Sequence, residues 1–189
     1  WKLFKAASCG KAVPRMEVKI VSPDPANIPG EILCKGDNVM LGYYKNPEAT
    51  AEVMTSDGWL RTGDLGVIDE DGYIYIKGRC KTMLLGANGQ NIYPEEIEAK
   101  LNNMPFVLES IVIEKEGKLY GLVYPDFEAV DSACISTKDL ELVMEENRKN
   151  LNSIVASYEG ITKLILYPTE FEKTPKKSIK RYLYTNIQV

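Results

Sequence analysis

The chain has 189 residues, a formal net charge of −4 and a pI near 5.1. Its 44% hydrophobic and 26% charged residues are ordinary for a soluble globular protein and are enough for one or two folded cores. The acidic balance argues against a general nucleic-acid binder, and no apolar run approaches the roughly 20 residues of a membrane-spanning helix. We expect a cytoplasmic protein without a nucleic-acid partner and with at most peripheral contact with a membrane surface.

The available side-chain chemistry is limited, because the sequence contains no histidine. This absence removes the usual general base and the Ser–His and Cys–His nucleophile pairs. The four cysteines are widely spaced and form no CxxC pair, so we expect no metal site and favour reduced thiols. They are Cys9, Cys34, Cys80 and Cys134.

The first 78 residues indicate a β-rich module. The segment 1–14 has no capped or turn-like start, and we expect it to continue from a longer protein. Alternation and β-branched residues predict strands at "MEVKIV" (16–21) and "EILCKG" (31–36). In "NPEAT", Asn46 and Pro47 are typical of the cap and the first position of a short helix.

Two further segments complete this module. The stretch "SDGWLRTGDLG" (56–66) is dense in turn-forming residues and predicts a structured loop. The stretch "VIDEDGYIYIKG" (67–78) predicts a β-hairpin with Asp71 and Gly72 in a tight turn.

The pattern then changes to helix, strand, strand, helix and strand, which predicts a compact α+β unit. The first helix is predicted in "YPEEIEAKLNNM" (93–104), and two strands in "LESIVIEKEGKLYGLVYP" (108–125). The last strand is predicted in "ITKLILYP" (161–168).

A long amphipathic helix is predicted over 137–159, with Thr137 as its cap and Gly160 as its stop. Its apolar face is predicted to comprise Leu140, Val143, Met144, Leu151, Ile154, Val155 and Tyr158.

Two charged residues near the middle of the chain are candidates for binding a ligand. Asp64 in a glycine-bracketed turn could accept two hydrogen bonds from a vicinal diol such as that of ribose, or could bond only its own backbone. The predicted hairpin would bring Arg79 beside Asp64, either at a ligand site or as a structural salt bridge. The stretch "GANGQN" (86–91) supplies backbone that could approach a ligand closely, or is a plain loop.

The acidic chain ends with a basic run, "EKTPKKSIKRYLY" (172–184). Its cations are Lys173, Lys176, Lys177, Lys180 and Arg181. The run could be a nucleic-acid patch, a membrane-surface patch, a solvated tail or a reactive site that needs cations.

Together these stretches resemble the adenylate-forming enzymes of the acyl-CoA synthetase superfamily. The resemblance rests on four blocks that occur in the family's order and approximate spacing: "GEILCKGDNVMLGYYKNPEAT", "DGWLRTGDLG", "GRCKTMLLGANGQNIYPEEIE" and "TPKKSIKRYLY". It covers nearly the whole chain and implies the C-terminal part of such an enzyme. The subtype resembles a long-chain fatty acid–CoA ligase, because of Lys81 at the hinge position and the "KRYLY" ending.

The resemblance implies an α+β architecture with two parts. Residues 1–78 would be the last β-rich subdomain of the large AMP-binding domain, and residues 79–189 the small mobile C-terminal domain. The family's phosphate loop, its magnesium and adenylate motif and most of its acyl pocket are expected upstream of Trp1. We therefore expect this chain alone to be inactive.

The resemblance also implies the chemistry. ATP and a fatty acid would give an acyl-adenylate, which CoA would convert to a thioester, with Mg²⁺ held by residues upstream. Asp64 would contact the ribose hydroxyls and Arg79 the ribose or a phosphate. Lys81 would be the pivot of a domain rotation between the two steps, and the region of Gly89 and Gln90 would approach the pantetheine of CoA.

In this family a lysine of the C-terminal motif reaches the adenylate, and the resemblance places that position at Ser178. We expect Lys177, on an irregular loop after Pro175, to be the substitute, with Lys180 as the second candidate. The alternative is a member with a weakened first step.

Two other functions stay open. One is a non-catalytic acyl- or nucleotide-binding module, and the other is an acyl ligase that transfers to a carrier-protein thiol in place of CoA. In each case the expected partner within the protein is the remainder of the N-terminal domain.

Overall fold

The computed structural model describes residues 4–86, 89–185 and 187. The chain divides into two compact units, an N-terminal unit of residues 1–82 and a C-terminal unit of residues 83–189. The border predicted from the sequence, between residues 78 and 79, lies shortly before this division. The assignment of the two parts to a large domain and a mobile domain stays a prediction.

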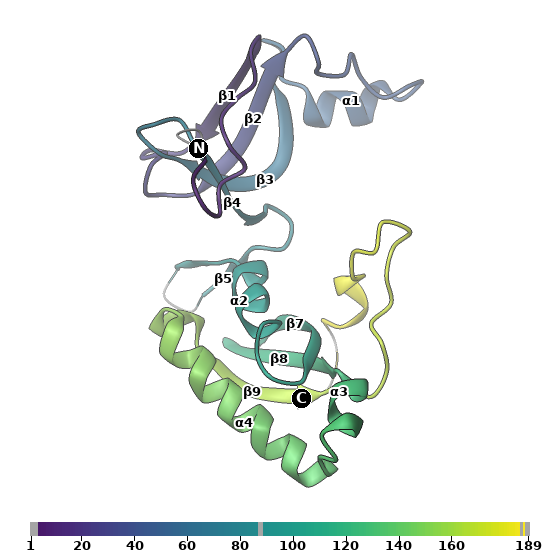
Figure 1. The fold of residues 1–189 in the computed structure, drawn as a ribbon. Helices are drawn as coiled ribbons and strands as arrows, with labels where there is room; N and C mark the ends of the chain where they lie inside the picture. Colours follow the sequence, from purple (N-terminus) through teal and green to yellow (C-terminus); the bar gives the residue numbers. More distant parts are fainter. Residues whose placement is uncertain (1–3, 87–88, 186, 188–189) are drawn as a thin grey trace. The chain divides into compact units, whose positions relative to one another are not determined.

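The N-terminal unit is built on an antiparallel four-stranded sheet in the order β1-β2-β3-β4 (Figure 1). Its strands are β1 (Met16–Val21), β2 (Gly30–Gly36), β3 (Leu60–Ile68) and β4 (Ile74–Arg79). The sequence prediction of the first two strands is confirmed. Helix α1 (Pro47–Val53) begins as predicted, because the Asn46 side chain accepts a hydrogen bond from the Ala49 N–H at 3.0 Å.

The loop predicted over residues 56–66 is wrong, because most of this stretch belongs to strand β3. The turn-forming residues produce an irregularity within the strand, where the register between β2 and β3 shifts around Ile32. There Thr62 donates its hydroxyl hydrogen to the Ile32 carbonyl at 2.9 Å, and Gly63 has a φ of +73°, which favours glycine. Asp64 therefore lies on a strand, within this irregularity, and not in a loop.

The predicted hairpin between β3 and β4 is confirmed. Gly72 has a φ of +82° and donates its N–H to the Asp69 carbonyl at 2.9 Å. The Asp69 carboxylate accepts hydrogen bonds from the backbone of Asp71 and Tyr73, at 3.0 and 2.9 Å, and from Lys5 Nζ at 2.6 Å. One side chain thus fixes both the turn and the segment that precedes β1.

The C-terminal unit contains a three-stranded sheet in the order β7-β8-β9 (Figure 1). Strands β7 (Val107–Lys115) and β8 (Lys118–Pro125) form the predicted antiparallel pair, and β9 (Ile161–Leu166), also predicted, runs parallel to β8. The first helix is confirmed as α2 (Pro94–Leu101). Further elements were not predicted: β5 (Leu84–Leu85), β6 (Asn91–Ile92), α3 (Phe127–Ser132), η1 (Ser157–Glu159) and η2 (Arg181–Leu183).

The two faces of this sheet have different coverings. On one face, helices α2, α3 and α4 (Thr137–Ile154) pack into a cluster that includes Val112 and Val123. On the other face, Ile111 and Leu122 pack against Phe171 and Tyr184 of the C-terminal segment. Because strand side chains alternate between faces, neighbouring residues of β7 enter different clusters. The C-terminal segment is thus part of the folded unit.

Helix α4 differs from its prediction at both ends. Its cap is Ser136, not Thr137, since the Ser136 Oγ accepts a hydrogen bond from the Asp139 N–H at 3.2 Å. The helix ends at Ile154, before the predicted Gly160, because the Glu159 carboxylate accepts a hydrogen bond from Ala156 N–H and starts the separate turn η1. Ile154 and Tyr158, predicted on the apolar face, are exposed.

Candidate functional site

Asp64 and Arg79 are brought together by the β3–β4 pairing, in which they lie directly opposite each other. Arg79 donates a hydrogen bond from Nη1 to Asp64 Oδ1 at 2.6 Å and a longer one to the Thr62 carbonyl at 3.4 Å. The Asp64 N–H is held by Thr62 Oγ1 at 3.0 Å. The carboxylate is therefore fixed by its backbone, while Arg79 remains 57% exposed. Asp64 Oδ2 makes no hydrogen bond within the described residues and can accept one from a ligand.

A cleft of about 430 Å³ lies beside this pair within the N-terminal unit. Small-molecule sites usually occupy about 300–1,000 Å³. Of the pair, Arg79 lines the cleft and Asp64 does not. The other polar or irregular parts of the lining include Glu31, Glu52, Arg61, Thr62, Gly63 and Lys81. An anionic ligand that also carries hydroxyl groups could meet arginine and lysine cations and a carboxylate here.

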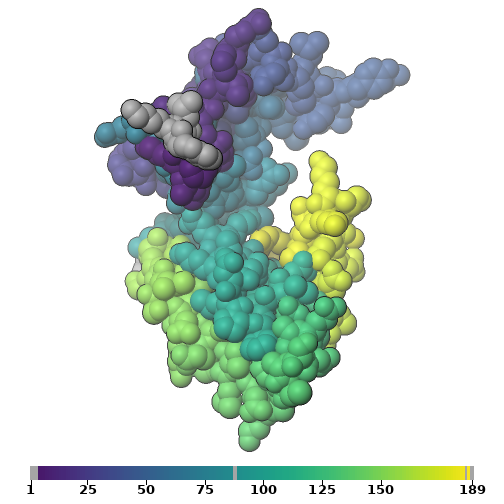
Figure 2. Space-filling view, in the orientation of Figure 1, coloured from purple at the N-terminus to yellow at the C-terminus, as the bar shows by residue number. Residues whose placement is uncertain are grey.

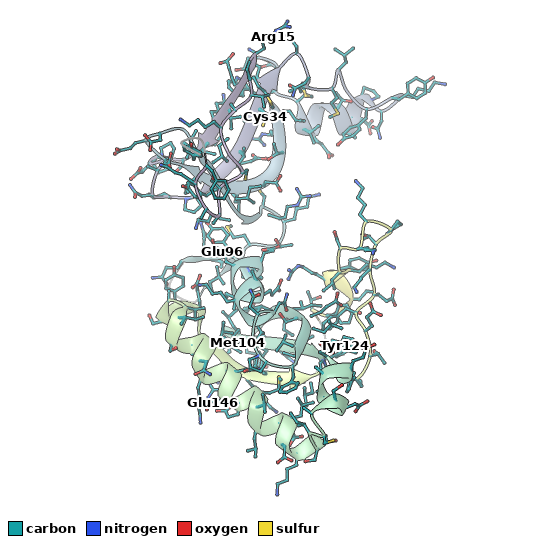
Figure 3. All side chains as sticks on the ribbon, in the orientation of Figure 1. Arg15, Cys34, Glu96, Met104, Tyr124 and Glu146 are labelled. Carbon is teal, nitrogen blue, oxygen red and sulfur yellow. The ribbon has the colours of Figure 1, made fainter. Side chains whose placement is uncertain are left out.

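The thiols do not add a nucleophile to this site. All four cysteines are free, and Cys34 lies on β2 in the four-stranded sheet (Figure 3). Burial raises the pKa of Cys34, and the charge of Asp64 raises it further. Burial likewise raises the pKa of Cys80. Both thiols are therefore protonated at neutral pH and poorly reactive.

The predicted hinge and CoA residues occupy exposed turns. Lys81 lies in the turn that follows β4, in which the Thr82 N–H donates to the Arg79 carbonyl at 3.2 Å. Gly89 and Gln90 are exposed in the turn between β5 and β6, where Gly89 has a φ of +75°. Residues 87–88 of "GANGQN" are outside the described residues. The roles of Lys81, Gly89 and Gln90 stay predictions.

The first half of the basic run folds into a tight turn, which we call the basic turn (residues 173–179). Lys173 and Ile179 form a β-bridge, and Thr174 donates its N–H to the Ser178 carbonyl at 2.8 Å. Lys177 donates its N–H to the Thr174 carbonyl at 2.8 Å and has a φ of +62°. The loop expected after Pro175 is thus a regular, hydrogen-bonded turn. The yellow segment that contains it projects from the surface of the C-terminal unit (Figure 2).

The two candidate lysines differ in their surroundings. Lys180 Nζ pairs with Glu172 Oε2 at 3.1 Å, and this contact raises its pKa. Lys177 is exposed, and its amine has no ion pair or hydrogen bond among the residues that the structure describes. Ser178, at the position where the resemblance places the family's lysine, is also exposed. Lys177 is therefore available to a ligand without first breaking a salt bridge.

The sequence reasoning missed a buried ion pair that involves this segment. Arg181 donates from Nη1 to Glu98 Oε1 at 2.6 Å and from Nη2 to Glu98 Oε2. Glu98 lies on α2 and also accepts the Val112 N–H at 2.6 Å. Burial raises the pKa of the Glu98 carboxyl, and Arg181 opposes this effect. A signal was present, because Glu98 falls on the buried stripe of Pro94, Ile97 and Leu101, where a charge needs a partner.

Neither a metal centre nor a membrane span emerges from the described part of the chain. There, no three Cys, Asp or Glu side chains are arranged so that they could hold a metal ion. Likewise, none of the described helices has both the length and the apolar character needed to cross a bilayer.

No protein-family model matches the chain, but individual proteins do. It is 35% identical over 182 residues to 4-coumarate–CoA ligase 1 of Arabidopsis thaliana, covering 94% of this chain and 31% of that protein. It is 33% identical over 184 residues to 2-succinylbenzoate–CoA ligase of Bacillus cytotoxicus, covering 96% of this chain and 36% of that protein. The chain thus spans about a third of the length of these relatives.

Solved structures give the same result. An ATP-bound RpMatB-BxBclM chimera matches with a TM-score of 0.76 and 28% identity, over 95% of this chain and 35% of that one. O-succinylbenzoate coenzyme A synthetase (MenE) of Bacillus subtilis, in complex with AMP, matches with a TM-score of 0.75 and 26% identity, over 97% and 36%. Over nearly its whole length, the chain is therefore similar in sequence and in fold to the C-terminal part of the AMP-binding acyl- and aryl-CoA ligases.

Proposed function

We propose that the full-length protein activates a carboxylic acid with ATP and transfers the acyl group to CoA. In the first half-reaction the carboxylate attacks ATP, which gives an acyl-adenylate and pyrophosphate. In the second, the CoA thiol attacks the acyl carbon, and AMP leaves. The observation that carries this proposal is the similarity of nearly the whole chain to CoA ligases, including structures that hold ATP or AMP.

The Asp64–Arg79 pair supports a nucleotide-binding role for the N-terminal unit. The free oxygen of Asp64 would accept hydrogen bonds from the ribose hydroxyls, and Arg79 would contact the ribose or a phosphate from the adjoining cleft. Lys81 would act as the pivot between the two steps, and the turn with Gly89 and Gln90 would approach the pantetheine of CoA. Since no described cluster fits a metal ion, we assign Mg²⁺ to no residue of this chain.

The basic turn would supply a cation to the first half-reaction. Negative charge builds on phosphate oxygens in this step, and an oriented cation stabilises it. Lys177 is our first candidate because its amine is exposed, while the amine of Lys180 is paired with Glu172. Lys176 is a neighbouring exposed cation that the resemblance does not implicate, and it offers a matched control.

The finer proposal concerns the acid. Lys81 and the "KRYLY" ending favour a long-chain fatty acid, whereas the relatives are named for 4-coumarate and 2-succinylbenzoate. ATP–pyrophosphate exchange by the full-length protein, with a panel of fatty, aromatic and short acids, separates these choices. Exchange with aromatic acids alone would reject the long-chain proposal. Exchange with no acid, despite nucleotide binding, would favour a non-catalytic binding module.

The role of Lys177 is tested by measuring the two half-reactions separately. We expect Lys177→Ala to lower adenylation by about 10²-fold, the lower end for loss of one electrostatic contact to a transition state. Thioester formation from pre-made acyl-adenylate should be unchanged. Lys177→Gly removes the amine while suiting the positive φ, so it should behave like Lys177→Ala. Lys176→Ala should match the wild type in both steps.

Two further variants complete this test. Lys180→Ala should have a smaller effect on adenylation than Lys177→Ala. A large gain from Ser178→Lys, together with no loss from Lys177→Ala, would show that the site lacks its lysine and that nothing replaces it. Measuring thioester formation with CoA and with an acyl carrier protein determines which thiol accepts the acyl group.

A further inference from the structure

We propose that the Glu98–Arg181 ion pair positions the basic turn for adenylation, which makes both members positioning residues. This inference rests on the proposed function. Neither residue needs to touch the substrate. Their role would be to hold the turn that carries Lys177 in one orientation on the C-terminal unit.

The basic turn is a self-contained hairpin whose orientation depends on its two ends. The backbone of Lys180 donates to the Glu172 carbonyl at 2.8 Å, which closes the hairpin below the bridge between Lys173 and Ile179. These bonds fix the shape of the turn. They do not fix where the turn points, because they are all internal to it.

The first end is fastened on the sheet. Phe171, directly before the hairpin, is 2% exposed and packs against Tyr184, with ring centroids 5.1 Å apart. Lys173 Nζ contacts Glu109 of β7 at 2.7 Å, and Glu172 donates its N–H to the Tyr184 hydroxyl oxygen at 2.7 Å. This attachment combines aromatic packing with a partly exposed ion pair.

The second end is fastened on α2 by the Glu98–Arg181 pair. Arg181 directly follows Lys180, so the pair acts within a few residues of the turn. A guanidinium held by two parallel N–H···O bonds has a defined orientation, which a single contact does not give. Glu98 in turn is oriented by the Val112 N–H of β7. This two-bonded contact, which we call the fork, therefore connects the C-terminal segment to α2 and to the β7-β8-β9 sheet.

The burial of this pair supports a geometric role. The Glu98 and Arg181 side chains are 8% and 25% exposed. A buried ion pair is often no more stabilising than apolar residues of similar volume, because both charges lose their hydration. Such a pair can instead select one arrangement of the chain. Here the pair would select one position of the segment that carries Lys177 against α2.

The conservative variant Arg181→Lys tests the inference in the full-length protein, since it keeps the charge and removes the fork. Its matched control is Arg148→Lys. Arg148 also makes two hydrogen bonds to one carboxylate, that of Glu145, at 2.8 and 2.6 Å, and is 23% exposed. It lies on α4, outside the C-terminal segment. Glu98→Gln is a second, milder test that keeps an acceptor for Val112.

We expect Arg181→Lys to lower the rate of adenylation at least tenfold, with little change in the KM for ATP and in thioester formation from pre-made acyl-adenylate. Glu98→Gln should have a smaller effect in the same direction, and Arg148→Lys should affect neither step selectively. Equal losses in both half-reactions for Arg181→Lys would show a purely structural role and overturn the inference.

Hydrogen–deuterium exchange gives a readout that is independent of activity. The amides to follow are those of Glu172, which donates to the Tyr184 hydroxyl oxygen, and of Val112, which donates to Glu98, because these bonds join the hairpin's anchors to the rest of the unit. Their exchange should rise at least tenfold in Arg181→Lys and stay at the wild-type rate in Arg148→Lys. Unchanged exchange would overturn the positioning claim even if activity fell. If the wild type adenylated no acid, the proposed function and the role in adenylation would both fail, while exchange would still decide whether the pair holds the turn.

Discussion

The two units each contain an arginine paired with a carboxylate, but the pairs are built differently. Arg79 meets Asp64 through one nitrogen, and the side chains are 57% and 30% exposed. Arg181 meets Glu98 through two nitrogens, and the side chains are 25% and 8% exposed. The first pair leaves a carboxylate oxygen free beside a cleft. In the second pair both carboxylate oxygens of Glu98 already accept hydrogen bonds from protein groups.

This difference separates a pair that can respond to a ligand from one that can only hold structure. Opening the exposed pair costs about 1 kcal/mol or less, because water replaces the lost contact. Opening the buried pair leaves the Glu98 carboxylate away from water, with the Val112 N–H in place of a directly bonded cation. The same two functional groups are therefore suited to recognition in one unit and to fixed geometry in the other.

The largest effect is expected from Arg181→Ala. Leaving Glu98 charged and buried should lower the free energy of unfolding of the C-terminal unit by on the order of 3–5 kcal/mol. Denaturant unfolding followed by a probe in this unit measures it. Arg148→Ala is the control: Arg148 is about as shielded as Arg181, but its partner Glu145 is 48% exposed and stays hydrated, and the Ile161 carbonyl keeps its bond from Asn152, so the loss should be about 1 kcal/mol or less. If the two losses were equal, the contrast between buried and exposed pairs would not hold.

The next effect concerns nucleotide affinity. Asp64→Ala in the full-length protein should weaken ATP binding by about 10- to 150-fold, or on the order of 1.5–3 kcal/mol, since a charged acceptor for the ribose hydroxyls is lost. Isothermal titration of the folded variant measures the change. Unchanged affinity would leave Asp64 as a structural partner of Arg79 only.

A smaller effect is expected from the same residue on stability. Asp64→Asn should change the free energy of unfolding of the N-terminal unit by less than about 1 kcal/mol, because Arg79 becomes solvated. A loss of several kcal/mol would show that the pair is structural after all. Measuring affinity and stability on one set of variants thus sharpens the contrast with Glu98.

The smallest effect is a pH dependence of the N-terminal unit. The hydrogen bond from Lys5, aided by the Tyr73 N–H, lowers the pKa of Asp69 from 3.8 to about 2. Because the folded-state pKa is the lower one, the stabilisation is complete above about pH 4 and is lost as the pH falls towards 2. NMR titration of the Asp69 carboxyl checks this. Lys5→Ala should move its midpoint back towards the ordinary value, and an unmoved midpoint would contradict the assignment.

Local patterns in the sequence predicted much of the fold. The Asn46 cap, the Asp71–Gly72 turn and the β7–β8 hairpin each depend on neighbouring residues, and all three are present. The turn-rich stretch around Asp64 was misread, because the same residues serve loops and irregular strands. Which use applies depends on pairing with β2, a strand more than 20 residues away.

In the candidate site, too, local contacts were predictable from the sequence and distant contacts were not. The hairpin prediction correctly placed Arg79 beside Asp64, since one local element connects them. The pairing of Glu98 with Arg181 joins positions 83 residues apart, and no periodicity relates them. The buried stripe of α2 shows that Glu98 needs a partner, and only the packing of the C-terminal segment shows which one.

The parallel pairing of β9 with β8 has a consequence for the order of folding. A two-residue turn joins β7 to β8, so this hairpin can form early, whereas β9 can pair only after the intervening helical crossover has closed. The aromatic contact between Phe171 and Tyr184 lies beyond β9 and needs that strand in place. In refolding, protection of the Thr174 and Lys177 amides should therefore appear later than protection of the β7–β8 hairpin, because the C-terminal segment assembles last.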